Sequence, residues 1–292
     1  MTRKITIIST FFLFFSSCEE NPFSSKSGIP HRKIFGVVNL EGVELYPEGN
    51  HSGIFIWSNQ LGISDLSGAD GSFELELPAA SSPNGGGIVD GDYTLYFFMA
   101  NYEVSTVEVT FAGGEILNDD RVIKIDGELR KRINLKRMVQ INTEVQPSTF
   151  PTDFEEDVKV LINATPDRSD IFFYLKGIEI PRMGTIYSGL LIKDASSGEL
   201  VLSFNPDTAN TIKRVIDKPY REFLINFEVI DDSLGSALPP GSYEAVPYII
   251  VESNDMVPTH LLEALGSDYN EFSEKYFRYP MYRTGGKFTI TE

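Results

Sequence analysis

Short runs in which polar and apolar residues alternate dominate the chain from residue 33 onward, and they restrict it to a β architecture. The clearest run is residues 72–77, Ser-Phe-Glu-Leu-Glu-Leu, where every second side chain is apolar until Pro78. A period of two places the apolar side chains on one face of a half-buried strand. Similar runs follow one another between turn residues such as Asp70-Gly71. We therefore predict an all-β protein of antiparallel sheets packed as sandwiches.

The strand-like runs form two sets, which predicts two tandem β-sandwich domains. The first set comprises residues 33–40, 52–58, 72–77, 92–98, 106–111 and 122–125. The second set comprises residues 139–145, 158–164, 171–175, 189–192, 200–204, 223–229, 238–251 and 287–291. We place the first domain at 32–138 and the second, immunoglobulin- or fibronectin-like, at 139–292. Two domains also suit a length of 292 residues. Residues 79–91, rich in Ser, Pro and Gly, are expected to form a loop.

One segment of the second domain has a helical rather than a β pattern. Between residues 259 and 277, apolar side chains recur at spacings of three and four, which predicts one apolar helix face. Thr259 after Pro258 suits the start of the helix, because a threonine hydroxyl accepts hydrogen bonds from free N–H groups there. Gly266 is a position at which the segment can divide into two short helices.

The N-terminus has the pattern of a secretory signal. Arg3 and Lys4 precede an apolar run of 11 residues at 5–15, and Ser16 and Ser17 follow it. At about 1.5 Å per residue the run is too short to cross a hydrocarbon core of about 30 Å. A basic start, a short apolar run and small residues together predict a signal peptide over residues 1–17.

The only cysteine of the chain follows directly. Phe15-Ser16-Ser17-Cys18 resembles the lipobox of bacterial lipoproteins, although Phe15 stands where that family usually has an aliphatic residue. The resemblance implies cleavage before Cys18 and acylation of this cysteine (palmitate among the chains), so that the protein is held at the outer membrane or cell surface. Residues 18–31 would then be a flexible tether. The acidic pair after the cysteine, Glu19-Glu20, is read either as a surface-export signal or as part of a solvated tether.

The first domain also carries a family resemblance. Phe35-Gly36-Val37-Val38, Asp70-Gly71-Ser72-Phe73, Gly91-Asp92-Tyr93-Thr94-Leu95 and Asn101-Tyr102 follow in this order. The order resembles that of the carboxypeptidase regulatory-like, or transthyretin-like, β-sandwich over residues 32–136, with Asn101 in place of the usual glycine. The resemblance implies an accessory module without peptidase activity.

Composition excludes several functions. The formal charge of −17 argues against nucleic acid as a partner. Loss of residues 1–17 would leave 23 basic and 42 acidic residues, a net charge of −19. One cysteine and three histidines are too few for a Cys/His zinc cluster. His51 and His260 lie far apart in sequence, and the chain has none of the familiar nucleophile or phosphate-binding motifs. We expect no enzyme, no catalytic residue, no cofactor and no metal.

The basic residues between 130 and 137 form a cluster in this acidic chain. Two interpretations are open: contact with anionic headgroups or a polyanion, or a solvated strand edge or linker, of which the second is favoured.

Aromatic residues are the remaining candidates for ligand binding. Trp57 is the only tryptophan and could lie on either face of its strand. Tyr279 and Tyr282 flank Pro280 and are expected to be an exposed pair, whereas Tyr269 and Tyr276 lie on the apolar helix face. We predict Trp57, Tyr279 and Tyr282 as ligand-binding residues. The sequence thus predicts a lipid-anchored envelope protein that acts as a non-catalytic interaction or structural module. The alternative is a glycan-binding surface lipoprotein of a nutrient-uptake system; the partner would be an envelope protein or a polysaccharide.

Overall fold

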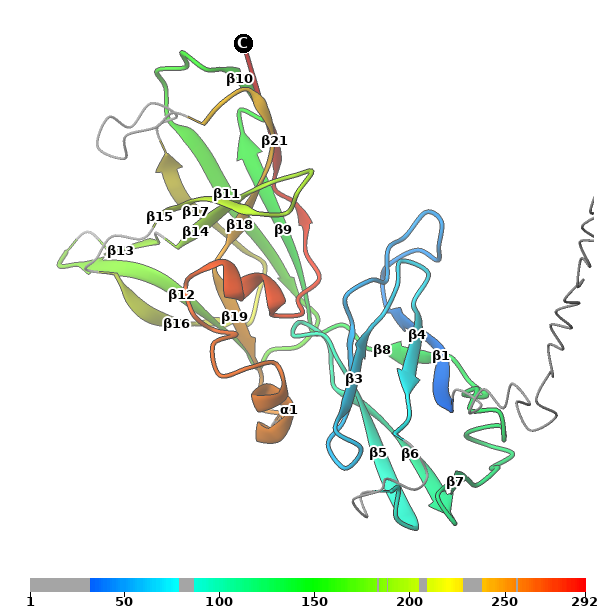
Figure 1. The fold of residues 1–292 in the computed structure, drawn as a ribbon. Coiled ribbons are helices and arrows are strands. Elements are labelled where there is room, and N and C mark those ends of the chain that lie inside the picture. The colour runs from blue at the N-terminus through cyan, green and yellow to red at the C-terminus, as the bar shows by residue number, and fades with distance from the viewer. Residues whose placement is uncertain are drawn as a thin grey trace, which may run out of the picture. The chain divides into compact units, whose positions relative to one another are not determined.

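A computed structural model describes residues 32–78, 87–182, 184–187, 189–204, 209–227, 238–255 and 257–292 (Figure 1). Residues Arg32–Glu292 belong to one compact unit. The predicted signal peptide, Cys18 and the predicted tether lie outside the described residues, as do residues 79–86 of the predicted loop. The regular secondary structure of the described part is almost all strand, so the prediction of an all-β protein with β-sandwich packing is confirmed.

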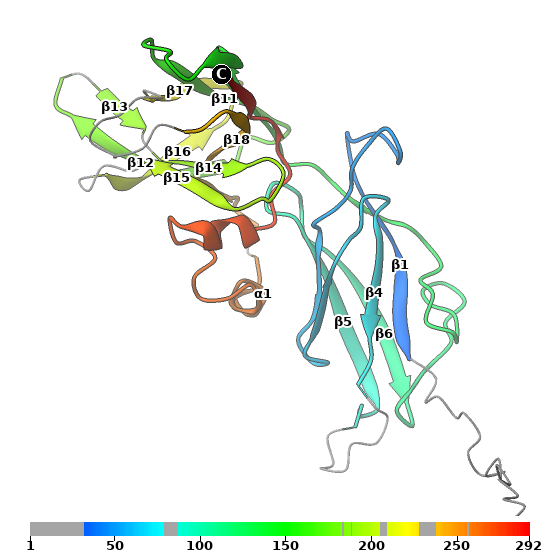
Figure 2. The same cartoon turned by 45° about the horizontal axis from the view of Figure 1, so that its top comes forward.

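The N-terminal strands pair into two sheets. In the described residues these sheets have the orders β4-β1-β8 and β3-β2-β5-β6-β7. Figure 2 shows β1 beside β4 and β5 beside β6, and both pairs are antiparallel. The strands are β1 (Lys33–Leu40), β2 (Phe55–Ser58), β3 (Ile63–Leu66), β4 (Ser72–Glu76), β5 (Gly91–Phe98), β6 (Ser105–Ala112), β7 (Glu115–Ile116) and β8 (Ile133–Leu135).

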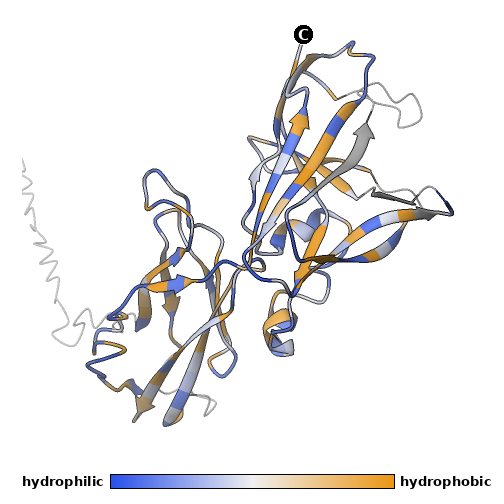
Figure 3. Ribbon diagram, turned by 180° about the vertical axis from the view of Figure 1, so that it is seen from behind, coloured by the Kyte–Doolittle hydropathy of each residue, from blue (hydrophilic) through white to orange (hydrophobic). Residues whose placement is uncertain are grey.

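Alternation along these strands fills the core between the two sheets. In β4, Phe73 and Leu75 are buried while Ser72, Glu74 and Glu76 are exposed, as a period of two requires. The same alternation of hydrophilic and hydrophobic residues is visible along several strands in Figure 3. The resulting core draws its buried apolar residues from the segment between Ile34 and Leu135.

The C-terminal strands form three further sheets among the described residues. Their orders are β10-β21-β18-β14-β15, β17-β11-β9-β20 and β13-β12-β16, with β19 also paired to β12. The strands are β9 (Val139–Gln146), β10 (Thr149–Pro151), β11 (Val158–Pro166), β12 (Ile171–Ile180), β13 (Gly184–Tyr187), β14 (Leu190–Asp194), β15 (Leu200–Phe204), β16 (Asn210–Ile216), β17 (Tyr220–Phe227), β18 (Gly241–Pro247), β19 (Ile249–Glu252), β20 (Thr284–Gly285) and β21 (Lys287–Thr291). Their own core runs from Met138 to Ile290.

The predicted helical segment is two short helices: α1 (Thr259–Ala264) and the 3-10 helix η1 (Glu274–Arg278). Gly266 has φ +102°, in the left-handed region that favours glycine, and it lies just beyond the end of α1. The division at this glycine therefore agrees with the sequence. The predicted threonine cap is wrong: Pro258 occupies the cap position, and no side chain caps the helix.

One predicted strand is also wrong. Residues 122–125 form no strand; Ile123 makes only isolated bridges, to Asp119 and Leu129. The reason is the close spacing of turns, because Asp119 and Lys124 both accept turn hydrogen bonds from following N–H groups. The run between them is too short for a continuous ladder: Val122 and Lys124 make only single backbone hydrogen bonds to Arg130 and Glu128, and Ile125 is 78% exposed.

A third apolar cluster joins residues of both strand sets. Phe55, Trp57 and Phe98 of the first set pack in one cluster with residues from the second set. The latter are Leu191, Val246, Tyr248, Leu261, Tyr276 and Tyr279. We call this group the junction cluster. All four residues of β2 are buried because one side of the strand faces the first core and the other faces this cluster.

Candidate functional site

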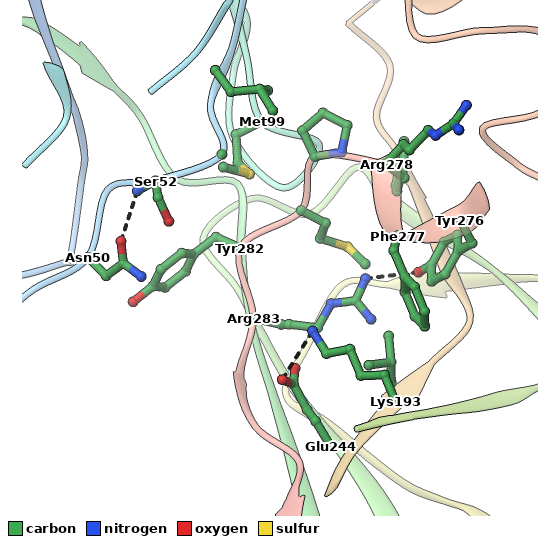
Figure 4. A pocket seen from close by; sticks show the side chains of 16 residues that line it. Asn50, Ser52, Met99, Lys193, Glu244, Tyr276, Phe277, Arg278, Tyr282 and Arg283 are labelled. Atoms are coloured by element: carbon green, nitrogen blue, oxygen red, sulfur yellow. Dashed lines mark hydrogen bonds and ion pairs between the residues drawn. The ribbon is translucent and has the colours of Figure 1, made fainter. Parts of the chain in front are cut away.

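A cavity of about 330 Å³ lies beside the junction cluster (Figure 4). Both strand sets contribute to its walls, the first through the loop at residues 50–53 and the second chiefly through residues 276–283. We call it the junction cavity. Its lining residues are Asn50, Ser52, Gly53, Leu66, Met99, Lys193, Glu244, Val246, Tyr276, Phe277, Arg278, Tyr279, Pro280, Met281, Tyr282 and Arg283.

Buried hydrogen bonds hold the C-terminal wall of the cavity in place. The Ala100 N–H donates to the Pro280 carbonyl at 2.6 Å. Asn101, itself buried, pairs with the backbone of Tyr282: its side-chain oxygen accepts from the Tyr282 N–H at 3.0 Å and its Nδ2 donates to the Tyr282 carbonyl at 2.9 Å. This amide acts as a neighbouring strand would, and it fixes the backbone from which the Tyr282 ring projects.

Tyr276 and Arg283 form the next part of the wall. The Tyr276 hydroxyl accepts from the Ile249 N–H at 2.8 Å and donates to the Ile249 carbonyl at 2.6 Å. Arg283 donates to the Tyr276 hydroxyl and to the Pro247 carbonyl, each at 3.0 Å. Its guanidinium therefore has a defined position in a half-buried wall.

The charged groups of the cavity are mostly cationic. Lys193 forms an ion pair with Glu244 at 3.1 Å and lies 5.6 Å from the centre of the Phe277 ring. Arg278 is exposed and Arg283 half-buried. Among the lining residues, all of them in the described part of the chain, three cations thus stand against the single carboxylate of Glu244.

The three aromatic residues predicted from the sequence do not form one surface. Tyr282 is half-buried and lines the cavity. Tyr279 also lines it, but the expectation that Tyr279 is exposed is wrong: only 5% of the residue is accessible. Its hydroxyl bonds to both backbone groups of Val251, and burial raises the pKa of this tyrosine well above its usual range.

Trp57 lies outside the cavity lining, and 7% of the residue is accessible. Its ring packs against Tyr96 at 5.8 Å and against His260, on α1, at 5.3 Å between ring centres. α1 therefore covers the face on which a ligand would stack.

The two histidines in the described residues, His51 and His260, contribute to packing and to backbone hydrogen bonding. His51 is fully buried, and its Nδ1 accepts from the Leu40 N–H at 3.1 Å. Burial lowers the pKa of His51, which favours the neutral ring. His260 contacts Trp57 and Tyr96, and neither histidine lines the junction cavity.

The basic cluster at residues 130–137 is largely paired with carboxylates. Arg130 bonds to Asp120 at 3.2 Å, Lys136 to Glu103 at 3.1 Å and Arg137 to Asp167 at 2.7 Å. Partners of this kind favour the interpretation as a solvated edge over a headgroup site.

The described ranges contain neither a cluster of metal-binding side chains nor a membrane-spanning helix. No group of three or more His, Cys, Asp or Glu residues is placed to hold a metal there. Nor is any helix in that part of the chain long and apolar enough to span a bilayer.

Sequence reasoning missed most of the cavity. It selected Tyr279 and Tyr282 but none of Lys193, Glu244, Phe277, Arg278 and Arg283. The strand-like runs that predict β14 and β18 gave no sign that Lys193 and Glu244 pair across them, or that both line the same cavity as the 276–283 segment. The only available signal was the density of aromatic and basic residues between 276 and 283.

Comparisons with known proteins give distant neighbours. No protein-family model matches the chain, and no curated protein matches it. Two crystal structures of BcpA, the major pilin subunit of Bacillus cereus, one of them a variant, align at 10% and 12% identity. The alignments cover 75% and 77% of this chain but just under two thirds of the pilin, 66% and 65%. The TM-scores are 0.27 and 0.23, and no function follows from likeness at this level.

Proposed function

We propose that this chain is a lipid-anchored protein of the bacterial cell envelope that binds a partner without catalysing a reaction. The anchor would be Cys18, on the basis of the lipobox-like sequence Phe15-Ser16-Ser17-Cys18. The compact unit begins at Arg32, so 13 residues separate Cys18 from it. We also propose that the first sandwich is related to the carboxypeptidase regulatory-like module, whose motif order it shares.

The junction cavity is the observation that carries a binding role. It has hydrogen-bonding side chains, fixed charges and aromatic walls, which are the groups that orient a small ligand. The groups of its inner wall are committed to structure: Tyr276 and Tyr279 bond to the backbone, and Glu244 is neutralised by Lys193. These groups are therefore engaged and do not form an acid–base pair for catalysis. The other lining residues can still bind a ligand.

Glycan binding is the ligand class that the cavity favours. Figure 4 shows Tyr282 and Phe277 on opposite sides of Arg283, with Asn50 next to Tyr282. Sugars are bound by aromatic faces that contact the apolar side of the ring, together with polar groups that bond to the hydroxyls. The lipoprotein would then bind a glycan at the cell surface and hold it there for uptake, without catalysing a reaction.

Acylation is tested with Cys18→Ser. The full chain is expressed in a Gram-negative host with labelled palmitate, and membranes are separated from the soluble fraction. We expect label and membrane retention for the original chain, and loss of both for the variant. Membrane retention of the unlabelled variant after carbonate washing would refute the anchor.

The cavity is tested with Tyr282→Ala on a polysaccharide panel. We expect at least one glycan to bind and the variant to weaken that binding about tenfold, in line with a stacking contribution of about 1.5 kcal/mol. Tyr46→Ala is the matched control, because Tyr46 is 59% exposed and outside the cavity lining. Equal weakening by both variants, or no binding to any glycan, would refute glycan binding at this cavity.

A further inference from the structure

We propose that the junction cavity recognises an acidic sugar, namely the carboxylate of a uronic-acid residue. This inference rests on the proposed glycan-binding function and adds the charge of the ligand. It follows from the electrostatics of the cavity, which are opposite to those of the chain as a whole.

The chain carries a formal charge of −17, yet the cavity lining holds Lys193, Arg278 and Arg283 against one carboxylate, Glu244. A concave surface lined mostly by charges of one sign concentrates their field. An anion that is repelled by most of the surface therefore meets attraction at this cavity.

The cations differ in how they can meet a ligand. Lys193 is held by Glu244, so this pair is close to neutral. Arg283 uses one hydrogen on Nη1 for Pro247 and one on Nη2 for Tyr276. A guanidinium has five N–H donors, so three remain for a carboxylate after these two bonds. Arg278 is exposed at the cavity rim, and in Figure 4 its side chain points away from Arg283. It therefore adds positive charge at longer range, and it shares this charge with Asp268.

The aromatic side chains of the cavity indicate which kind of molecule would bear the carboxylate. Tyr282 and Phe277 flank Arg283 in Figure 4, so an apolar ring face and an anionic group would be met together. A pyranose ring that bears a carboxylate presents both features. The cavity volume of about 330 Å³ is at the small end of ligand pockets, which suits one or two sugar residues.

The test compares a charged oligosaccharide with its uncharged ester and with the charged monomer. Binding of the full chain in detergent is measured by calorimetry with trigalacturonate, with its fully methyl-esterified form and with free galacturonate. We expect trigalacturonate to bind about tenfold or more tightly than the ester, and the difference to shrink as salt rises from about 50 to 500 mM. Free galacturonate distinguishes a site for the monomer from one that needs a polymer.

Three variants test whether the preference for the acidic ligand arises from the charged residues of the cavity. Arg278→Gln is expected to weaken trigalacturonate about three- to fivefold and to leave the ester unchanged. Glu244→Gln removes the only lining carboxylate and is expected to tighten trigalacturonate by a similar factor. Arg132→Gln alters the net charge equally at an exposed site outside the cavity lining and is expected to change nothing.

The outcomes separate the two proposals. Equal affinity for the acid and the ester, with both lost in Tyr282→Ala, would overturn the acidic-sugar inference and leave glycan binding intact. Failure of both ligands and of the whole glycan panel would overturn the proposed function as well. Equal weakening by Arg278→Gln and Arg132→Gln would show that net charge rather than the cavity attracts the acid, and would also overturn the inference.

Discussion

The Tyr276 hydroxyl is expected to be one of the most important polar groups for stability in the junction cluster. Tyr276 is 1% exposed, and its hydroxyl bonds to the Ile249 N–H at 2.8 Å, to the Ile249 carbonyl at 2.6 Å and to Arg283 at 3.0 Å. The change Tyr276→Phe keeps the ring and its packing but removes the partner of all three groups.

The magnitude follows from the groups left behind. A buried donor or acceptor without a partner costs about 1–3 kcal/mol. Ile249 is buried and leaves two such groups, whereas half-buried Arg283 keeps its bond to Pro247 and can turn to water. We therefore expect Tyr276→Phe to lower the free energy of unfolding by about 2–4 kcal/mol, or the melting temperature by about 5–15 °C.

The chain supplies its own reporter for this experiment. Trp57 is the only tryptophan and belongs to the same cluster as Tyr276. Urea unfolding followed by tryptophan fluorescence therefore measures the stability of the region that has been altered.

The matched control is Tyr93→Phe. The Tyr93 hydroxyl also bonds to both backbone groups of one residue, Val89, at 3.1 and 2.8 Å, but these bonds are exposed. Water can replace them, so we expect a loss of less than about 0.5 kcal/mol. If Tyr276→Phe costs no more than Tyr93→Phe, the reasoning about unsatisfied groups at the junction is refuted.

Three further predictions concern titration, the backbone and charge. Burial lowers the pKa of His51, so the unfolded chain binds its proton first as pH falls below about 6.5, and stability declines from there toward the folded pKa. His51→Asn should flatten this decline in urea titrations between pH 7.5 and 5; an unchanged slope would contradict it. Gly71→Ala, with φ +79° and a Cβ that would lie 2.1 Å from the Val38 carbonyl oxygen, should cost clearly more than Gly53→Ala, with φ +80° and open space. The latter isolates backbone strain, about 1–2 kcal/mol; equal melting temperatures would contradict the clash. Arg168 bonds to Glu103, Asp170 and Asp255, so Arg168→Gln should reduce the salt dependence of thermal unfolding, and an unaltered dependence would show that these bonds contribute nothing.

Sequence periodicity predicted those strands that have one buried face and one solvent-exposed face. Residues 72–77 differ from β4 by one residue, because polar side chains alternate with buried ones there. Residues 33–40 coincide with β1, whose β-branched and aromatic residues indicate a strand without strict alternation. The same reasoning failed at 122–125, where the residues have strand propensity but turns on both sides limit the pairing to isolated bridges. Whether a segment forms a strand depends on pairing with residues that are often far away in the sequence. A local sequence pattern does not contain this information.

The aromatic candidates show a second limit. A tryptophan or tyrosine is equally suited to an exposed stacking surface and to an apolar interface between domains. Trp57 and Tyr279 lie in the junction cluster. They are buried because α1 and the 276–283 segment pack there, which the local sequence does not indicate. The cavity was not predictable for the same reason, since its charged residues come from β14, β18 and the C-terminal segment.

The paired hydrogen bonds between Asn101 and Tyr282 have a consequence for how the protein can be divided. Together with the bond from Ala100 to Pro280, they tie a corner of the first strand set to the last forty residues of the chain. A protein cut at residue 138 would leave Phe55, Trp57 and Phe98 facing water in one fragment and Tyr276 and Tyr279 in the other. Such fragments are expected to associate or precipitate rather than behave as independent domains. A substitution on the junction-cluster face of either half therefore has to fit the surface of the other half.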